Sequence, residues 1–161
     1  MSQVFLTADT HFFHKKILEF ERAARPFSSV EEMNEVLIDN WNATVTKRDT
    51  VWHLGDVCFG KVENLEILSR LNGTKNLILG NHDRHGIHNY LRYFRKIEAA
   101  KKYDGYLWTH IPVHPGQFYR FIGNVHGHLH SGKIEDPRYV CVSVERYNLA
   151  PIAWEEIKHA K

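Results

Sequence analysis

The stretch NVHGHLH at residues 124–130 places three histidines at alternate positions of the chain. If this segment is extended, its side chains alternate between two faces, so His126, His128 and His130 are predicted to form one row of imidazoles. Gly127 has no side chain and allows another group to approach the backbone closely. A solvated hairpin is the competing interpretation. Buried imidazoles without partners would be costly, so the row predicts complementary ligands elsewhere in the chain.

Polar clusters follow three apolar runs in the first half of the chain. Residues 4–8, 50–54 and 76–79 each have the composition of a buried strand. These runs end at Asp9-Thr10-His11, at Gly55-Asp56 and at Gly80-Asn81-His82-Asp83. Functional residues commonly lie at the carboxyl ends of strands in α/β sheets, although a helix N-cap is a purely structural role open to Asp9. We therefore expect the three clusters to meet at one edge of a sheet.

The segments between these runs have helical spacing. Apolar residues recur at helical intervals in residues 14–22 and 63–71, and Ser29 with Glu32 forms a capping-box signature for a further helix. A short helix is expected over residues 84–94, with Asp83 as its N-cap, and the alternative role of Asp83 is to orient the loop or His82. His14 is expected at the surface or the rim rather than among the ligands. The alternation of strands and helices predicts an α/β fold for this half.

The second half of the chain has the pattern of strands. Residues 95–100 and 105–110 are predicted to pair with each other, turning near Asp104-Gly105. Residues 111–122 contain prolines and are expected to form a long loop. A closing strand is predicted over residues 139–144, and a brief strand with a terminal helical turn over residues 151–161. Without a linker or a repeat, the chain is predicted to form one α/β domain spanning residues 1–161.

The composition narrows the class of protein. The 161 residues are 43% hydrophobic and 25% charged, as in an ordinary globular protein, and the net charge of +2 gives no electrostatic argument for nucleic acid. No apolar run approaches the length of a membrane span, and none at the N-terminus resembles a signal peptide. The two cysteines, Cys58 and Cys141, form no disulfide framework. We therefore expect a cytoplasmic protein with no membrane contact.

The candidate ligands combine carboxylate, amide and imidazole groups: Asp9, His11, Asp56, Asn81, His110, His128 and His130. The set lacks a thiolate pair, so a structural zinc knuckle is not expected. Oxygen and imidazole donors suit Mn²⁺, which we favour, and they also suit Fe, Zn²⁺ or Ni²⁺. Seven ligands are too many for one catalytic ion that keeps an open position. They suit two ions that share one carboxylate and clamp the reacting oxygens.

These motifs, in this order, resemble the five sequence blocks of the calcineurin-like metallophosphoesterases. The blocks are Asp9-Thr10-His11, Gly55-Asp56, Gly80-Asn81-His82-Asp83, His110 and Gly127-His128-Leu129-His130. They span residues 9–130, and the short chain is similar to the minimal bacterial and phage branch of the family. The resemblance implies two facing mixed β-sheets flanked by helices. It also implies hydrolysis of phosphate esters by a hydroxide shared between two metal ions.

The resemblance further implies a role for each residue. Asp9, His11, Asp56 and His130 resemble the ligands of the first metal; Asp56, Asn81, His110 and His128 resemble those of the second, with Asp56 as the bridge. His82 stands outside the ligand set and is expected to stabilise the transition state or to protonate the leaving oxygen. His126 is a candidate for orienting a ligand by a hydrogen bond.

The substrate prediction depends on a departure from the family pattern. The protein-phosphatase branch carries an Asp and an Arg after the second block, where this chain has Phe59 and Gly60. Because a monoester dianion benefits from a guanidinium, we expect small phosphodiesters to be the substrates. His114, Tyr119 and Arg120 are candidates for substrate contacts. The competing hypotheses are a phosphomonoesterase, a nuclease and a non-catalytic metal-binding scaffold, and nucleic acid is less favoured as a partner than a small phosphorylated molecule.

Overall fold

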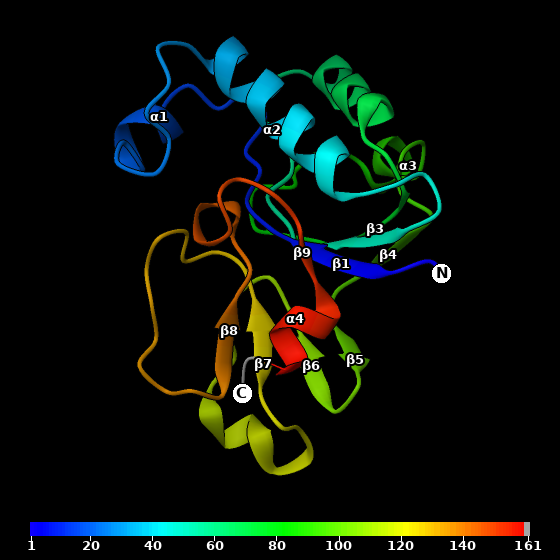
Figure 1. Ribbon diagram of the computed structural model, residues 1–161, viewed down its shortest axis with the longest axis vertical. Coiled ribbons are helices and arrows are strands. Elements are labelled where there is room, and N and C mark those ends of the chain that lie inside the picture. Colours follow the sequence, from blue (N-terminus) through cyan, green and yellow to red (C-terminus); the bar gives the residue numbers. More distant parts are fainter. Residues whose placement is uncertain (160–161) are drawn as a thin grey trace.

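The computed structural model describes residues 1–159 and contains two mixed β-sheets (Figure 1). The first sheet has the order β4-β3-β2-β1-β9, and the second has the order β5-β6-β7-β8. The strands of the first sheet are β1 (Val4–Thr7), β2 (Thr50–His53), β3 (Thr74–Ile78), β4 (Lys96–Glu98) and β9 (Ile152–Ala153). Those of the second are β5 (Lys101–Tyr103), β6 (Tyr106–Trp108), β7 (Asn124–His126) and β8 (Tyr139–Cys141). Strands β1 to β4 are parallel, as are β6 to β8, whereas β9 and β5 are antiparallel to their neighbours.

The first sheet is buried on both faces, as its apolar runs predict. Phe5 and Val51 pack in the core beneath the helices. Their neighbours Leu6 and Trp52 point the other way, into a second core that also contains Trp108 of β6. Successive side chains of a strand alternate between faces, so one strand supplies both cores. This packing joins the two sheets face to face and confirms the predicted architecture of two mixed sheets flanked by helices.

The helical segments lie outside and between the sheets. They are α1 (Ile17–Phe20), α2 (Val30–Thr44), η1 (Val62–Arg70), α3 (Ile87–Tyr90), η2 (Pro115–Arg120), η3 (Val144–Arg146) and α4 (Trp154–His159), where η denotes a 3₁₀ helix. Helices α2 and η1 cover the face of the first sheet that is turned away from the second sheet (Figure 1). The predicted cap of α2 is confirmed, because Ser29 Oγ accepts a hydrogen bond from Glu32 N at 3.1 Å.

Two of the predicted helices differ from the observed ones. The segment 14–22 is helical only at α1, and the segment 63–71 forms the 3₁₀ helix η1. Its buried Leu65 and Leu68 are three residues apart, a spacing that places both on one side of a 3₁₀ helix as well as of an α-helix. Periodicity therefore located the buried positions correctly but did not distinguish the two hydrogen-bond patterns.

The predicted pairing of residues 95–100 with residues 105–110 is wrong. Strand β4 extends the first sheet beside β3, and the partner of β6 is β5 instead. The predicted turn is confirmed: Asp104 and Gly105 have φ values of 51° and 84°, which is the geometry of a two-residue hairpin turn. The chain passes from one sheet to the other between β4 and β5, a change that an alternating pattern does not reveal.

The closing elements agree with the expectation. Strands β8 and β9 and helix α4 lie within the ranges predicted for a closing strand, a brief strand and a helical turn, except that residues 160–161 of the predicted turn lie outside the described residues. Within residues 1–159, no helix combines the length and the apolar character that a membrane crossing requires.

Candidate metal centre

The predicted ligands come together where parallel strands end. Strands β1, β2 and β3 are parallel neighbours, so the segments that follow them emerge at one edge of the first sheet. Backbone hydrogen bonds from Asp9 N to Gly55 O (2.9 Å) and from His11 N to Asp56 O (3.1 Å) join the first two of these segments. The segment after β7 meets them, because His128 N donates to Asp9 Oδ2 at 2.8 Å. The two sheets therefore deliver polar side chains to one place.

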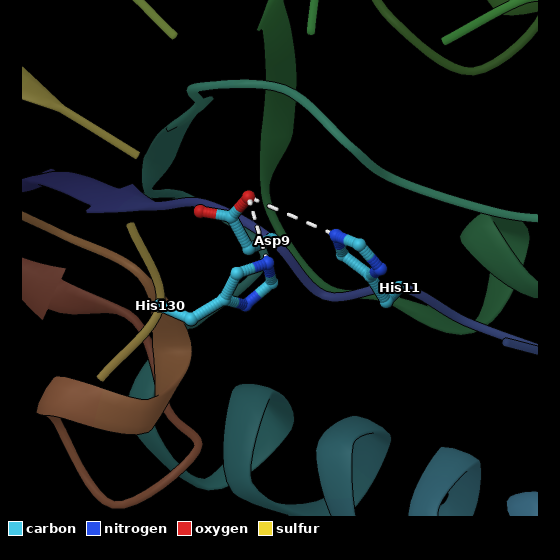
Figure 2. A group of neighbouring side chains, drawn as sticks. All are labelled: Asp9, His11 and His130. Atoms are coloured by element: carbon cyan, nitrogen blue, oxygen red, sulfur yellow. Dashed lines mark ion pairs between the residues drawn. The ribbon is translucent and has the colours of Figure 1, made fainter. Parts of the chain in front are cut away.

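A first group of candidate ligands consists of Asp9, His11 and His130 (Figure 2). Asp9 Oδ1 lies 3.8 Å from His11 Nε2 and 4.0 Å from His130 Nε2. Figure 2 shows both rings turned toward the carboxylate, although His130 belongs to a segment more than a hundred residues away in sequence. Three ligand atoms within 4.8 Å of one another can surround a single cation.

A second group consists of Asp56, His110 and His128. His110 Nε2 lies 3.3 Å from Asp56 Oδ2. Asn81 adds an amide oxygen, which is 2.9 Å from His110 Nε2 and 3.0 Å from His128 Nδ1. The seven predicted ligands thus divide into two clusters, each with carboxylate and imidazole donors.

Asp56 lies between the two groups. Its Oδ2 atom is 3.3 Å from His110 Nε2 and 3.6 Å from His11 Nε2. One carboxylate therefore contacts an imidazole of each group. A shared carboxylate is the feature that brings two cations to the separation found in two-metal sites, about 3.5–4 Å.

The free polar atoms of the first group fit a cation. Asp9 Oδ1 and His11 Nε2 are buried and have no hydrogen-bond partner within the described part of the chain. The other oxygen of Asp9 is occupied, because it accepts hydrogen bonds from His128 N (2.8 Å) and Ser143 Oγ (2.6 Å). Buried polar atoms without partners are rare in folded proteins, and here both face the same point. A bound cation would satisfy them.

The histidine rings are fixed through the nitrogen that faces away from the site. His110 Nδ1 lies 2.7 Å from the carbonyl oxygen of Leu54, and His130 Nδ1 lies 2.9 Å from Glu145 Oε1. In the neutral form of each ring, a proton on Nδ1 leaves Nε2 as the nitrogen that can coordinate a cation. Metal-binding histidines are commonly oriented in this way.

The charges of the site support the same interpretation. Burial opposes ionisation of Asp9 and Asp56, but the close approach of His11 and of the other histidines holds the pKa of each carboxyl below its usual range. Burial likewise opposes protonation of His110 and His130, yet the carboxylates Asp56 and Glu145 raise the pKa values of these two rings. The site thus favours ionised carboxylates, and a cation that binds here would displace any proton held by the coordinating nitrogens.

The histidine row is not an extended strand, and that prediction is wrong. Strand β7 ends at His126, and both His128 (φ 70°) and His130 (φ 51°) have left-handed backbone conformations. His126 itself is buried, and its Nδ1 lies 2.7 Å from Gly127 O, so its role in orienting a ligand stays a prediction. These left-handed conformations direct the His128 ring toward Asn81 and the His130 ring toward Asp9. Such strained conformations in non-glycine residues are concentrated at functional sites.

Two glycines permit the close packing of the ligand loops. A Cβ atom on Gly80 would overlap Asp56 Oδ1, and one on Gly127 would lie 2.6 Å from Asp9 Oδ2 and from Ala8 Cβ. Neither approach is tolerated between real atoms. The predicted close approach at Gly127 is confirmed, and its partner is the first ligand segment.

His82 and Asp83 organise the loop after β3. His82 N donates to Asp56 Oδ1 at 2.8 Å, and the His82 ring centroid lies 6.1 Å from that of His11. Asp83 is not the N-cap of α3, which begins four residues later. Instead its carboxylate accepts hydrogen bonds from the backbone of Asp56, Val57 and Gly80 at 2.8–2.9 Å. Asp83 therefore holds the second and third ligand segments together.

His14 supports the first group and was missed as a functional residue. Its Nδ1 lies 2.9 Å from His11 Nδ1, and its ring stacks on Phe59 at 4.0 Å with an interplanar angle of 4°. Burial, together with the neighbouring His11, lowers the pKa of His14 to about 4. His14 is half-buried, which agrees with the predicted surface or rim position, but its contact with a candidate ligand was not predicted. The signal in the sequence was its position three residues after His11.

The proposed substrate contacts lie away from the ligand groups. His114, Tyr119 and Arg120 belong to η2 or flank it, and η2 lies before the start of β7, whereas His128 and His130 follow its end. His114 Nδ1 accepts from Gly116 N at 3.1 Å, and the guanidinium of Arg120 lies over the Tyr119 ring. Tyr119 is 77% exposed. The structure does not bring these residues to the ligands, and their contact with substrate stays a prediction.

Two Asp/His clusters that meet at one carboxylate could each hold a metal ion, so their arrangement fits a dinuclear centre. A model of the calcineurin-like phosphoesterase family matches residues 2–159. The chain is 37% identical over 170 residues to the uncharacterized protein MJ1445 of Methanocaldococcus jannaschii, covering 98% of this chain and 90% of that protein. It is 40% identical over 87 residues to the Gene 66 protein of Mycobacterium phage L5, covering 52% and 41% of the two chains. A solved protein of unknown function from Aquifex aeolicus, AQ665, matches the whole of both chains with a TM-score of 0.78 and 26% identity.

The chain therefore belongs to the calcineurin-like phosphoesterase family. Its two Asp/His clusters fit the dinuclear centre of that family, and the protein is a metal-dependent phosphoesterase. The predicted family and fold are confirmed.

Proposed function

We propose that this chain hydrolyses small phosphodiesters at a dinuclear metal centre and that residues 1–161 form one metallophosphoesterase domain. The observation that carries the proposal is the position of Asp56 Oδ2, 3.6 Å from His11 Nε2 and 3.3 Å from His110 Nε2. The first metal would be held by Asp9, His11, Asp56 and His130. The second would be held by Asp56, Asn81, His110 and His128. The mixture of oxygen and imidazole donors favours Mn²⁺ and also suits Fe, Zn²⁺ or Ni²⁺.

Two bound cations would supply Lewis acidity and a water of lowered pKa at neutral pH. The chain supplies the geometry around them. Asp9 is fixed by Ser143 and by the backbone of His128, so its free oxygen keeps one direction. Asp56 is fixed through Oδ1 by the backbone of His82. Rigid ligands of this kind keep the reacting groups aligned.

His82 is the proposed catalytic residue. Its backbone is held against Asp56, while its half-buried side chain lies beside the first group, with Phe59 and His11 as ring neighbours. We expect the imidazole to stabilise the transition state or to donate a proton to the leaving alkoxide oxygen, and its position beside the first group supports this role. Proton transfer by a positioned side chain typically contributes about 10²–10⁴-fold to a rate.

The preference for a diester is supported by the residues that follow Asp56. Phe59 is stacked against His14, and Gly60, which has no side chain, stands where the phosphatase branch has an arginine. A guanidinium does lie behind the site, that of Arg25, but it is fully buried and donates to Glu145 and to the carbonyl oxygens of Asp9 and Thr10. It is therefore not available to a phosphoryl oxygen. A diester carries one negative charge, which two cations and His82 can balance without it.

A direct comparison of two substrates tests this preference. In the presence of Mn²⁺, kcat/KM for bis(p-nitrophenyl) phosphate should exceed kcat/KM for p-nitrophenyl phosphate. A clear preference for the monoester would contradict the proposal and favour a phosphomonoesterase, with Arg120 as the next residue to substitute.

A nuclease and a non-catalytic scaffold each have a test of their own. A nuclease would show substrate binding that weakens steeply with salt, whereas binding of a small substrate would depend on salt only slightly. A non-catalytic metal-binding scaffold would bind cations without turnover of any phosphate ester. A cytoplasmic location remains part of the proposal, and Cys58 and Cys141 are both free thiols, as a reducing compartment would require.

A further inference from the structure

Arg25 is a buried charge that the ligand motifs do not explain. It lies in the segment between α1 and α2, and it is fully shielded from solvent. A buried guanidinium is costly unless its donors are paired. Here they are paired: Nη1 donates to Thr10 O at 2.9 Å, and Nη2 donates to Asp9 O at 2.5 Å. Arg25 thus fixes the backbone of Asp9, the first candidate ligand, through hydrogen bonds.

Glu145 links this guanidinium to His130, the last candidate ligand in the sequence. Its Oε1 atom accepts from Arg25 Nε at 2.8 Å and from Arg25 Nη2 at 2.6 Å. The same atom lies 2.9 Å from Nδ1 of His130. Glu145 belongs to η3, the segment that follows β8, and it is 120 residues from Arg25 in sequence. One oxygen therefore joins the Arg25 guanidinium to a candidate ligand of the first group.

The contacts give this pair a defined effect on the site. An imidazole that donates through Nδ1 must present Nε2 as an acceptor, so Glu145 fixes both the tautomer and the ring orientation of His130. At the same time, Arg25 fixes the backbone position of Asp9. Asp9 Oδ1 and His130 Nε2, 4.0 Å apart, are thus held by one rigid unit. A buried ion pair is weak evidence for stability alone, because desolvation offsets much of its attraction.

We propose that Arg25 and Glu145 are positioning residues that hold Asp9 and His130 in the geometry the first metal requires. The inference rests on the proposed function, since it assumes that the first group binds a cation. The second group has no contact with Arg25 or Glu145 among those described above. The pair should therefore act on one metal site and leave the other unchanged.

Mn²⁺ binding tests the inference without any measurement of turnover. The wild-type protein, Arg25→Met and Glu145→Ala would be titrated by calorimetry, with EPR to distinguish single ions from coupled pairs. We expect two sites in the wild-type protein. Each variant should lose about 10–100-fold in affinity at one site, keep the other, and show no coupled pair at Mn²⁺ concentrations that fill the wild-type protein.

The controls come from an exposed pair of the same chemistry. Arg70 and Glu35 form a two-pronged ion pair with both N–O distances at 2.7 Å, on side chains that are 50% and 56% exposed. Arg70→Met and Glu35→Ala remove the same groups without touching the site, so both metal affinities should remain as in the wild-type protein. Circular dichroism of every metal-free variant verifies the fold.

Conservative variants keep the test decisive if the truncated ones do not fold. Gln in place of Glu145 retains an oxygen that accepts from His130, so Glu145→Gln should lose less affinity than Glu145→Ala. Lys in place of Arg25 keeps the charge but cannot make all four hydrogen bonds to Asp9, Thr10 and Glu145, so Arg25→Lys should still weaken one site. A folded Arg25→Lys or Glu145→Gln protein with two unchanged affinities would overturn the inference. Equal weakening of both sites would also overturn it, whereas a wild-type protein that binds no cation would instead contradict the proposed function.

Discussion

The two groups of candidate ligands are held in different ways. In the first group, side chains hold the ligands: Ser143 on Asp9, His14 on His11, and Glu145 on His130. In the second, main-chain groups hold the ligands, such as the Leu54 carbonyl on His110 and the His82 N–H on Asp56. The first group is therefore supported mainly by side chains, and the second largely by the backbone that follows the strands.

The buried ligands are alike in the two groups, since Asp9 and His11 in the first and Asp56 and His110 in the second are all shielded from solvent. Asn81, beside the second group, is exposed. A hollow of about 360 Å³ opens next to Asn81 and His110, bounded further by Leu79, Gly80, Ala99, Thr109 and Ile111. We infer that a substrate would enter from this side of the centre.

The largest expected effect comes from the residue that belongs to both groups. Asp56→Asn removes the shared carboxylate and an anion that faces both proposed cations, so it should abolish turnover more completely than loss of one histidine. The measurement is kcat/KM with saturating Mn²⁺ for Asp56→Asn and for His128→Ala, whose side chain belongs to the second group alone. Comparable residual activity in the two variants would contradict the bridging position.

The His82→Ala variant tests whether His82 contributes to catalysis without binding a metal in either group. His82→Ala should lose about 10²–10⁴-fold in kcat, the usual contribution of a general acid, while both metals stay bound. Metal content and kcat are measured on the same sample. A vacant second site in this variant would instead make His82 a ligand.

Acidification should weaken metal binding in both groups. The pKa values of His130 in the first group and His110 in the second are raised by Glu145 and Asp56, although burial opposes this. A cation binds the neutral imidazole, so affinity is full above these raised pKa values and falls as the pH drops through them. The expected loss is about tenfold per pH unit for each displaced proton. Calorimetric Mn²⁺ titrations between pH 8 and pH 5.5 measure it, and a flat profile would show that neither ring releases a proton.

His14 should have the smallest effect, and it should act on the first group alone. His14→Ala frees His11 Nδ1 and removes the ring stacked on Phe59, so we expect about a tenfold loss of affinity at one metal site. Since the pKa of His14 is lowered to about 4, the ring is neutral across the range in which the enzyme would work, and the effect should not vary with pH between 6 and 8. Metal titrations at those two pH values check both statements.

The sequence predicted the candidate ligands better than the residues that hold them in place. The seven candidate ligands directly follow strands or lie in short motifs, and local patterns identify such positions. Arg25 and Glu145 could not be found in this way, because 120 residues separate them and neither lies in a motif. The left-handed backbone of His128 and His130 was likewise missed, since an alternating pattern predicts extension by default.

The fold was predicted to a similar degree. Strands β1, β2 and β3 were predicted from their apolar runs, and helix α2 was predicted from its capping-box signature. The transfer of the chain from β4 in the first sheet to β5 in the second depends on packing between the sheets, which the composition of two short strands does not encode.

The central claim is that activity requires both groups to be filled, and one titration tests it most directly. Metal-free protein would receive Mn²⁺ in steps up to three equivalents, with bound metal and hydrolysis of bis(p-nitrophenyl) phosphate measured at each step. The account predicts little activity in molecules that hold one ion and a steep rise as the second equivalent binds. Full activity at one equivalent, or in the metal-free protein, would contradict it.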